Sequence, residues 1–102
     1  MSQLILKTDS FSQYQGEDNA YPEVLSFAFE QEVDWDEAEL LLSIWLRQQA
    51  FEVQEFILGA DRLCWRLTFA GYACLFNAEL LTQSFWFEFE DKITLEAFKM
   101  AF

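Results

Sequence analysis

The segment from Arg62 to Phe69, RLCWRLTF, alternates along its length, with every odd-numbered position apolar and the even-numbered positions mostly polar. Such alternation is typical of a strand with one buried face, because successive side chains point to opposite sides of a sheet. A two-residue turn at Ala70–Gly71 would pair Phe69 with Tyr72, Leu67 with Cys74, Trp65 with Phe76 and Leu63 with Ala78. Alanine is unfavourable at positive φ, so a type I turn with a bulge at the glycine is the alternative. Either turn predicts an antiparallel hairpin with an apolar inner face.

A further alternating segment, from Ser84 to Glu90, predicts another strand of the same meander. Its phenylalanines, Phe85, Phe87 and Phe89, fall on the inner face, and Trp86 falls on the outer face.

The segment from Phe51 to Leu58 precedes the hairpin, and its inward face is ambiguous. A three-residue loop over 59–61 would match Ile57 with Leu63 and Val53 with Leu67. It would also turn Glu55 toward the core. In that case Glu55 would lie at the sheet margin. The alternative is that the opposite face, with Phe56 and Leu58, is the buried one.

A helix is expected after Asp34, within a segment that carries six carboxylates in eleven residues, FEQEVDWDEAE. Asp34 can accept a hydrogen bond from the amide of Glu37, and Glu37 can reach back to the Asp34 amide, which is a capping box. Apolar residues then recur at helical spacing: Ala38, Leu41, Leu42 and Trp45. The acids have a local explanation, because a helix N-terminus favours negative charge by about 0.3–1 kcal/mol per residue.

The remaining segments complete an α+β pattern. We expect a weak strand over Gln3–Lys7, a long loop over Thr8–Glu23, a strand over Val24–Glu30 and a short helix over Thr94–Phe102 with Thr94 as its cap. The predicted fold is an antiparallel sheet, made of a four-strand meander plus one or two N-terminal strands. One main helix packs on a face of the sheet, and a short helix follows at the C-terminus. A chain of 102 residues is expected to form a single domain, 1–102.

Catalytic chemistry has few candidate residues, because the chain contains no histidine. Arrangements of Ser-His or Cys-His are therefore excluded, and the most common neutral metal ligand is missing. Asp34 and Asp36 are spaced like the start of a calcium loop, but Glu39 replaces the required glycine and Trp45 the required glutamate. We therefore predict a non-enzyme with no catalytic residue, no metal and no cofactor. Paired carboxylates, as in glycoside hydrolysis, are the third hypothesis for function.

The two cysteines, Cys64 and Cys74, are ten residues apart and form no CxxC motif. In the register above they point to different faces of the sheet, which predicts that they do not form a disulfide. We expect Cys74 to be buried and Cys64 to be the more accessible thiol.

The formal net charge is -12, with 18 acidic residues against six basic ones. Such a balance repels nucleic-acid phosphates and anionic lipids, so we expect neither direct nucleic-acid binding nor membrane binding. With no span of about 20 apolar residues and no secretory pattern, a cytoplasmic location is expected. The acids could instead imitate a nucleic acid and occupy a basic groove of a protein, or only keep an aromatic chain soluble. This candidate acidic surface comprises Glu30, Glu32, Asp36 and Glu39.

The outer face of the predicted sheet is the leading candidate for an interaction surface. Its composition of aromatic, aliphatic and arginine side chains is typical of protein interfaces. Its residues are Trp86, Leu75, Ala73, Arg66, Arg62 and Glu88. If the second helix or the N-terminal arm does not cover this face, it would bind a protein partner or a second copy of the chain, as in a symmetric homodimer.

The segment Ser84–Glu88, SFWFE, following a short hairpin, resembles small bacterial families of uncharacterised domains of similar length. The resemblance covers the last third of the chain. It implies no functional residues.

Overall fold

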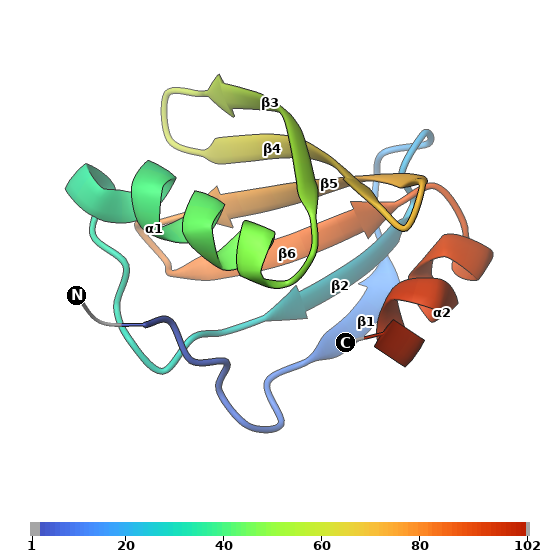
Figure 1. Cartoon of the computed structure of the whole chain (residues 1–102), viewed down its shortest axis with the longest axis horizontal. Coiled ribbons are helices and arrows are strands. Elements are labelled where there is room, and N and C mark those ends of the chain that lie inside the picture. The colour runs from blue at the N-terminus through green and yellow to red at the C-terminus, as the bar shows by residue number, and fades with distance from the viewer. Residues whose placement is uncertain (1–2, 102) are drawn as a thin grey trace.

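The computed structural model describes residues 3–101, which contain six strands and two helices (Figure 1). They are β1 (Ser12–Gln15), β2 (Glu23–Phe27), α1 (Trp35–Gln48), β3 (Glu52–Leu58), β4 (Leu63–Phe69), β5 (Tyr72–Glu79), β6 (Ser84–Phe89) and α2 (Lys92–Ala101). The strands form one sheet in the order β1-β2-β6-β5-β4-β3, and all neighbouring pairs are antiparallel. The predicted α+β fold is confirmed.

The hairpin of β4 and β5 has the register that the alternation predicts. Its pairs include Phe69 with Tyr72, Leu67 with Cys74, Trp65 with Phe76 and Leu63 with Ala78. Both turn residues adopt positive φ, 50° at Ala70 and 86° at Gly71. Two positive angles are what a tight type I′ turn requires, because its twist matches that of the strands. The bulged alternative is not adopted.

A β-bulge in β3 resolves the ambiguity in that strand. The register against β4 shifts between Val53 and Glu55, so that Val53 pairs with Leu67 while Phe56 pairs with Trp65. One extra residue moves the following side chains to the opposite face of the sheet. Val53 and Phe56 therefore both pack against the core, and Glu55 lies on the outer face. The predicted pairing of Ile57 with Leu63 is wrong by one residue.

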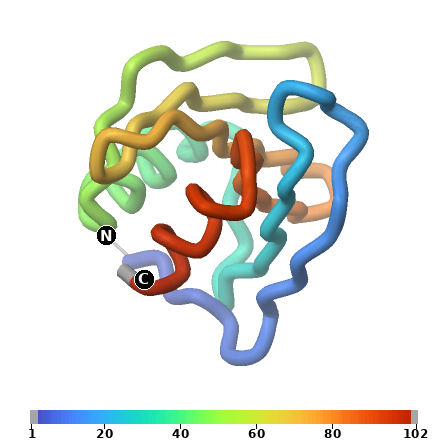
Figure 2. The backbone as a smooth tube through the Cα atoms, turned by 90° about the vertical axis from the view of Figure 1, so that its right-hand side faces the viewer, coloured from blue at the N-terminus to red at the C-terminus, as the bar shows by residue number. Residues whose placement is uncertain are grey.

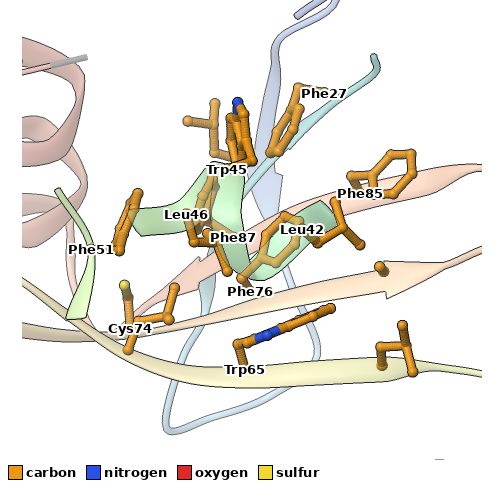
Figure 3. Packing of buried hydrophobic residues seen from close by; sticks show 14 of the residues in the cluster. Phe27, Leu42, Trp45, Leu46, Phe51, Trp65, Cys74, Phe76, Phe85 and Phe87 are labelled. Atoms are coloured by element: carbon orange, nitrogen blue, oxygen red, sulfur yellow. The ribbon is translucent and has the colours of Figure 1, made fainter. Parts of the chain in front are cut away.

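One face of the sheet, here called the inner face, carries a layer of buried aromatic side chains beneath α1 and α2 (Figure 3). The ring centroid of Phe87 lies 5.0 Å from those of Phe51, Phe76 and Phe98. Trp65 is fully buried, and its indole nitrogen donates a hydrogen bond of 2.9 Å to the hydroxyl of Ser43 on α1. That bond satisfies the polar edge of the indole and fixes α1 over β4.

The N-terminal segment differs from the prediction in two places. The predicted strand over Gln3–Lys7 is wrong, since Leu6 forms only an isolated bridge with Phe29. The predicted loop over Thr8–Glu23 is interrupted by β1, which pairs with β2. All four residues of β1 are exposed, so the strand lacks the apolar alternation by which strands are detected.

The helix caps also differ from the prediction in detail. Asp34 occupies the N-cap position of α1, but its side chain makes no capping hydrogen bond. At α2 the cap is Asp91 rather than Thr94, because one Asp91 carboxylate oxygen accepts hydrogen bonds from both the amide and the hydroxyl of Thr94, each 2.8 Å. Leu95 and Phe98 are buried as predicted, whereas Phe102 lies outside the described residues.

Candidate interaction surface

The outer face of the sheet is built by the strand register. One row across β6, β5 and β4 contains Glu88, Leu75 and Arg66, and the adjacent row contains Trp86, Asn77 and Cys64. Both α1 and α2 lie on the other side of the sheet, where Phe98 of α2 contacts rings of the inner layer. The helix that could have covered the outer face therefore does not cover it.

The loop between β1 and β2 shelters part of this face (Figure 2). Val24 points outward yet is buried, and a Cβ placed on Gly16 would lie only 2.6 Å from Val24 Cγ2. Partial burial raises the pKa of the loop residue Tyr21, as do the nearby carboxylates of Glu90 and Asp18. The loop thus lies over the part of the face around Val24 and Glu88, and the end of the sheet around Trp86 stays open.

Trp86 is half-buried between two hollows on this open part of the outer face. One hollow, of about 290 Å³, lies beside Arg62, Cys64 and Ile57. The other, of about 390 Å³, lies beside Tyr14 and Ser26. An indole with a hollow on each side can be enclosed by a partner's side chains with little rearrangement of the backbone.

Arg62 lies over the indole of Trp86, with its guanidinium carbon 5.9 Å from the ring centroid. This cation–π contact contributes about 0.5–1 kcal/mol at an exposed site. Arg66 pairs instead with Glu55 of β3, at 3.1 Å from nitrogen to oxygen. Both of these side chains are about half exposed, so their ion pair contributes little to stability.

A buried polar residue, Asn77, lies beneath the Trp86 surface, and the sequence argument did not identify it. Asn77 is 2% exposed, and its amide nitrogen donates a hydrogen bond of 2.8 Å to the carboxylate of Glu88. Burial and the charge of Asp18 raise the pKa of Glu88, while Arg62 and hydrogen bonds from Asn77 and Trp86 oppose that rise. The signal available in the sequence was a lone asparagine at an outward position within the otherwise apolar segment Ala73–Ala78.

The predicted interaction residues thus occupy one face but differ in accessibility. Trp86 and Arg62 lie together at the open end. Ala73 and Leu75 are only partly exposed, and Glu88 is half-buried. Trp86 and Arg62 are therefore the residues of this set that a partner could contact most directly.

The cysteines lie on opposite faces, as the register predicted. Cys74 is buried in the inner layer, and Cys64 is partly exposed on the outer face. Burial raises the pKa of both thiols, that of Cys74 to about 12. A raised pKa means that less of the nucleophilic thiolate is present at neutral pH.

The candidate acidic surface is exposed at all four of its positions, Glu30, Glu32, Asp36 and Glu39. Within residues 3–101 none of the four takes part in an ion pair. Of these four, Glu32 lines a hollow, together with Asp34 and Asp61. Across the described residues, no group of three or more His, Cys, Asp or Glu side chains is placed to hold a metal ion.

Neither helix in the described part of the chain is long and apolar enough to cross a membrane. The fold and this surface define a two-layer α+β domain, with one sheet face under helices and the other partly open. The chain belongs to the family described as Protein of unknown function (DUF3630), whose model matches residues 17–99. No curated protein and no solved structure matches the chain.

Proposed function

We propose that this protein is a non-catalytic interaction domain, which binds a second copy of the chain through the outer sheet face around Trp86. One observation carries the proposal: α1 and α2 both pack on the inner face, and the open end of the outer face holds a tryptophan stacked with an arginine. Tryptophan and arginine are the residue types that most often dominate binding energy at protein interfaces. When a second copy covers this surface, its apolar area is removed from water, and this burial stabilises the dimer.

The register makes this face complementary to itself. A two-fold axis parallel to β5 would set β6 of one copy over β4 of the other. Trp86 would then face the hollow beside Cys64, because Trp86 and Cys64 occupy one row of the sheet. Closed two-fold dimers are the most common soluble oligomers. Glu79 would meet its own copy at the open end of the sheet, where salt screens like charges.

The test is the substitution Trp86→Ala, with sedimentation velocity as the measurement. Loss of a central tryptophan typically costs at least about 2 kcal/mol of binding, which weakens association about 30-fold. Trp35→Ala is the matched control, since Trp35 is also partly exposed but lies at the start of α1, outside this surface. We expect the wild type and Trp35→Ala to dimerise and Trp86→Ala to sediment as a monomer. A wild type that stays monomeric at every concentration, or a Trp86→Ala dimer of unchanged affinity, would refute the proposal.

A second candidate function is imitation of nucleic acid by Glu30, Glu32, Asp36 and Glu39, which would occupy a basic groove of another protein. It is supported by the exposure of these four carboxylates and by the net charge of -12. Salt separates the two candidates. At about 1 M salt the Debye length falls to about 3 Å, so association through charges should be lost, while apolar association should persist or strengthen.

A carboxylate-based enzyme is the third candidate, and the only support for it is that Glu32, Asp34 and Asp61 line one hollow. All three residues are exposed to water. A carboxyl group that acts as a general acid is usually held in apolar surroundings, which raise its pKa. This arrangement therefore favours binding over catalysis.

A further inference from the structure

A further hollow lies at the end of the molecule, next to the two hollows beside Trp86, and it shares Asp61 with one of them and Gln83 with the other. It lies between the start of α1, the loop joining β3 to β4 and the turn joining β5 to β6, which meet at the left of Figure 1. We propose that this end hollow, of about 510 Å³, binds a segment of another protein in which a lysine or arginine adjoins a bulky apolar side chain. The site goes beyond self-association and uses none of the outer-face residues predicted above.

The apolar part of the end hollow consists of large side chains in contact with water. Leu81, in the turn between β5 and β6, is 93% exposed, and Trp35, in the first turn of α1, is 47% exposed. Leu80 and Val33 also line the hollow but are buried in the fold. Exposed apolar groups that gather around a hollow mark binding surfaces more often than single exposed residues do. An apolar side chain of a partner would be enclosed between Trp35 and Leu81.

The charged part of the end hollow has one sign. Glu32, Asp34 and Asp61 line it, and no lysine or arginine within residues 3–101 does. The positive end of the α1 macrodipole, equivalent to about half a charge, is outweighed by these three carboxylates. A cationic side chain next to the apolar anchor would therefore be attracted, whereas a phosphate or a carboxylate would be repelled.

The hollow is held in place by Gln83. Its side-chain amide nitrogen donates hydrogen bonds to the carbonyls of Val33 and Leu80, at 2.9 and 2.8 Å, and its oxygen accepts a hydrogen bond of 2.9 Å from the Val33 amide. These bonds join the entry of α1 to the turn after β5. Gln83 itself has a φ of 53°, a conformation that is unfavourable for a residue other than glycine. A pre-formed hollow binds at a lower entropic cost than one that must order upon contact.

The occupant is a heterologous segment, because a second copy would offer few cations. The chain has only six lysines and arginines against 18 acids. Of the arginines, Arg62 lies over Trp86 and Arg66 pairs with Glu55. Charge complementarity thus points to a basic protein segment.

The probe is a short synthetic peptide in which arginines flank one leucine, titrated into the ¹⁵N-labelled full-length chain. Two comparison peptides carry glutamates in place of the arginines, or glycine in place of the leucine. We expect the first peptide to shift the amide signals of residues 32–35, 60–61 and 80–83. The two comparison peptides should bind at least about tenfold more weakly, since each lacks one half of the recognition.

Leu81→Ser tests the apolar contact without disturbing the core, because the Leu81 side chain is almost fully exposed. The matched control is Leu40→Ser, an exposed leucine on α1 that does not line the hollow. We expect Leu81→Ser to weaken binding about tenfold and Leu40→Ser to leave it unchanged. If the wild type and Leu81→Ser bind the peptide with equal affinity, the apolar contact contributes nothing and charge attraction alone explains the binding. That result would overturn the proposal. So would shifts located elsewhere, or an affinity weaker than about 1 mM.

Discussion

The two faces of the sheet share one backbone but are stabilised by different interactions. On β6, the inward Phe85, Phe87 and Phe89 are at most 1% exposed, whereas the outward Ser84, Trp86 and Glu88 are each partly exposed. The inner face is stabilised by the burial of apolar surface area and by the packing of aromatic rings beneath α1 and α2. The outer face depends on hydrogen bonds, one ion pair and the loop between β1 and β2. Stability should therefore reside in the inner face, which leaves the outer face free to evolve binding.

The largest expected effect comes from Phe87→Ala, because Phe87 is fully buried at the centre of the aromatic layer. Removing a buried phenylalanine leaves a cavity that neighbouring rings cannot fill, which costs about 3–5 kcal/mol. The neighbouring substitution Trp86→Ala changes the outer face and should cost about 1 kcal/mol of monomer stability or less. Urea unfolding of the two variants, followed by circular dichroism, measures the contrast.

This contrast fails if the two substitutions destabilise the monomer equally. The measurement should be made at a protein concentration low enough to keep all variants monomeric, since dimerisation would add its own stabilisation.

A smaller effect is expected at Gln83, where the inner layer meets the end hollow. Gln83→Ala removes three hydrogen bonds and leaves the Val33 amide and the carbonyls of Val33 and Leu80 without these partners. A buried polar group left unsatisfied costs about 1–3 kcal/mol, and we expect a loss of about 2 kcal/mol. Thermal unfolding measures this loss.

Gln83→Glu is the informative comparison for that position. A glutamate can still accept the hydrogen bond from the Val33 amide, but its carboxylate cannot donate to the two carbonyls. If Gln83→Ala unfolds at the same temperature as the wild type, the hydrogen bonds are not what joins α1 to the turn.

The inner face could be predicted from the sequence because it depends on local alternation. The odd-numbered residues of β4 and β6 are all apolar, so the period alone identifies the buried face and the hairpin register. The position of α1 followed in the same way from Asp34 and the apolar stripe beginning at Ala38.

The features that the sequence did not predict depend on contacts between distant segments. The strand β1 has the sequence SQYQ, which has no apolar face, and it forms only because the edge of β2 is available. The bulge beside Gln54 was not foreseen, and neither alternative considered for β3 allowed Val53 and Phe56 to face inward together. The hydrogen bonds of Gln83 to Val33 span 50 residues of sequence.

The candidate site was predicted in part for the same reason. Alternation correctly assigned Trp86 to the outer face, but no local pattern showed that the loop between β1 and β2 would shelter the part of this face around Val24 and Glu88. Likewise, the capping box expected of Asp34 and Glu37 does not form, although Asp36 and Glu37 do lie in the first turn of α1. The proximity of Asp34 to Asp61 and Leu81 arises from the tertiary fold.

The cysteines allow the two faces to be compared within one molecule by their chemistry. Cys64 lies on the outer face and Cys74 in the inner layer, so a thiol reagent added to the folded chain should modify Cys64 first. The variants Cys64→Ala and Cys74→Ala identify which thiol reacts. Cys74 should react only when the chain unfolds, so its rate should follow the free energy of unfolding.

The smallest expected effect is the dependence of stability on alkaline pH, which arises from the same burial of Cys74. Burial raises the pKa of this thiol from 9.0 to about 12, so above about pH 9 the unfolded chain loses a proton that the folded chain keeps. The unfolded state is thereby favoured, and stability is lost as the pH rises from about 9 toward about 12, by about 1 kcal/mol at about pH 10. Urea unfolding at about pH 8 and about pH 10 should show a smaller loss for Cys74→Ala than for the wild type. If the wild type and Cys74→Ala lose equal amounts of stability, Cys74 ionises as readily in the folded chain as in the unfolded one. The inner layer would then be as accessible to water and charge as the outer face is.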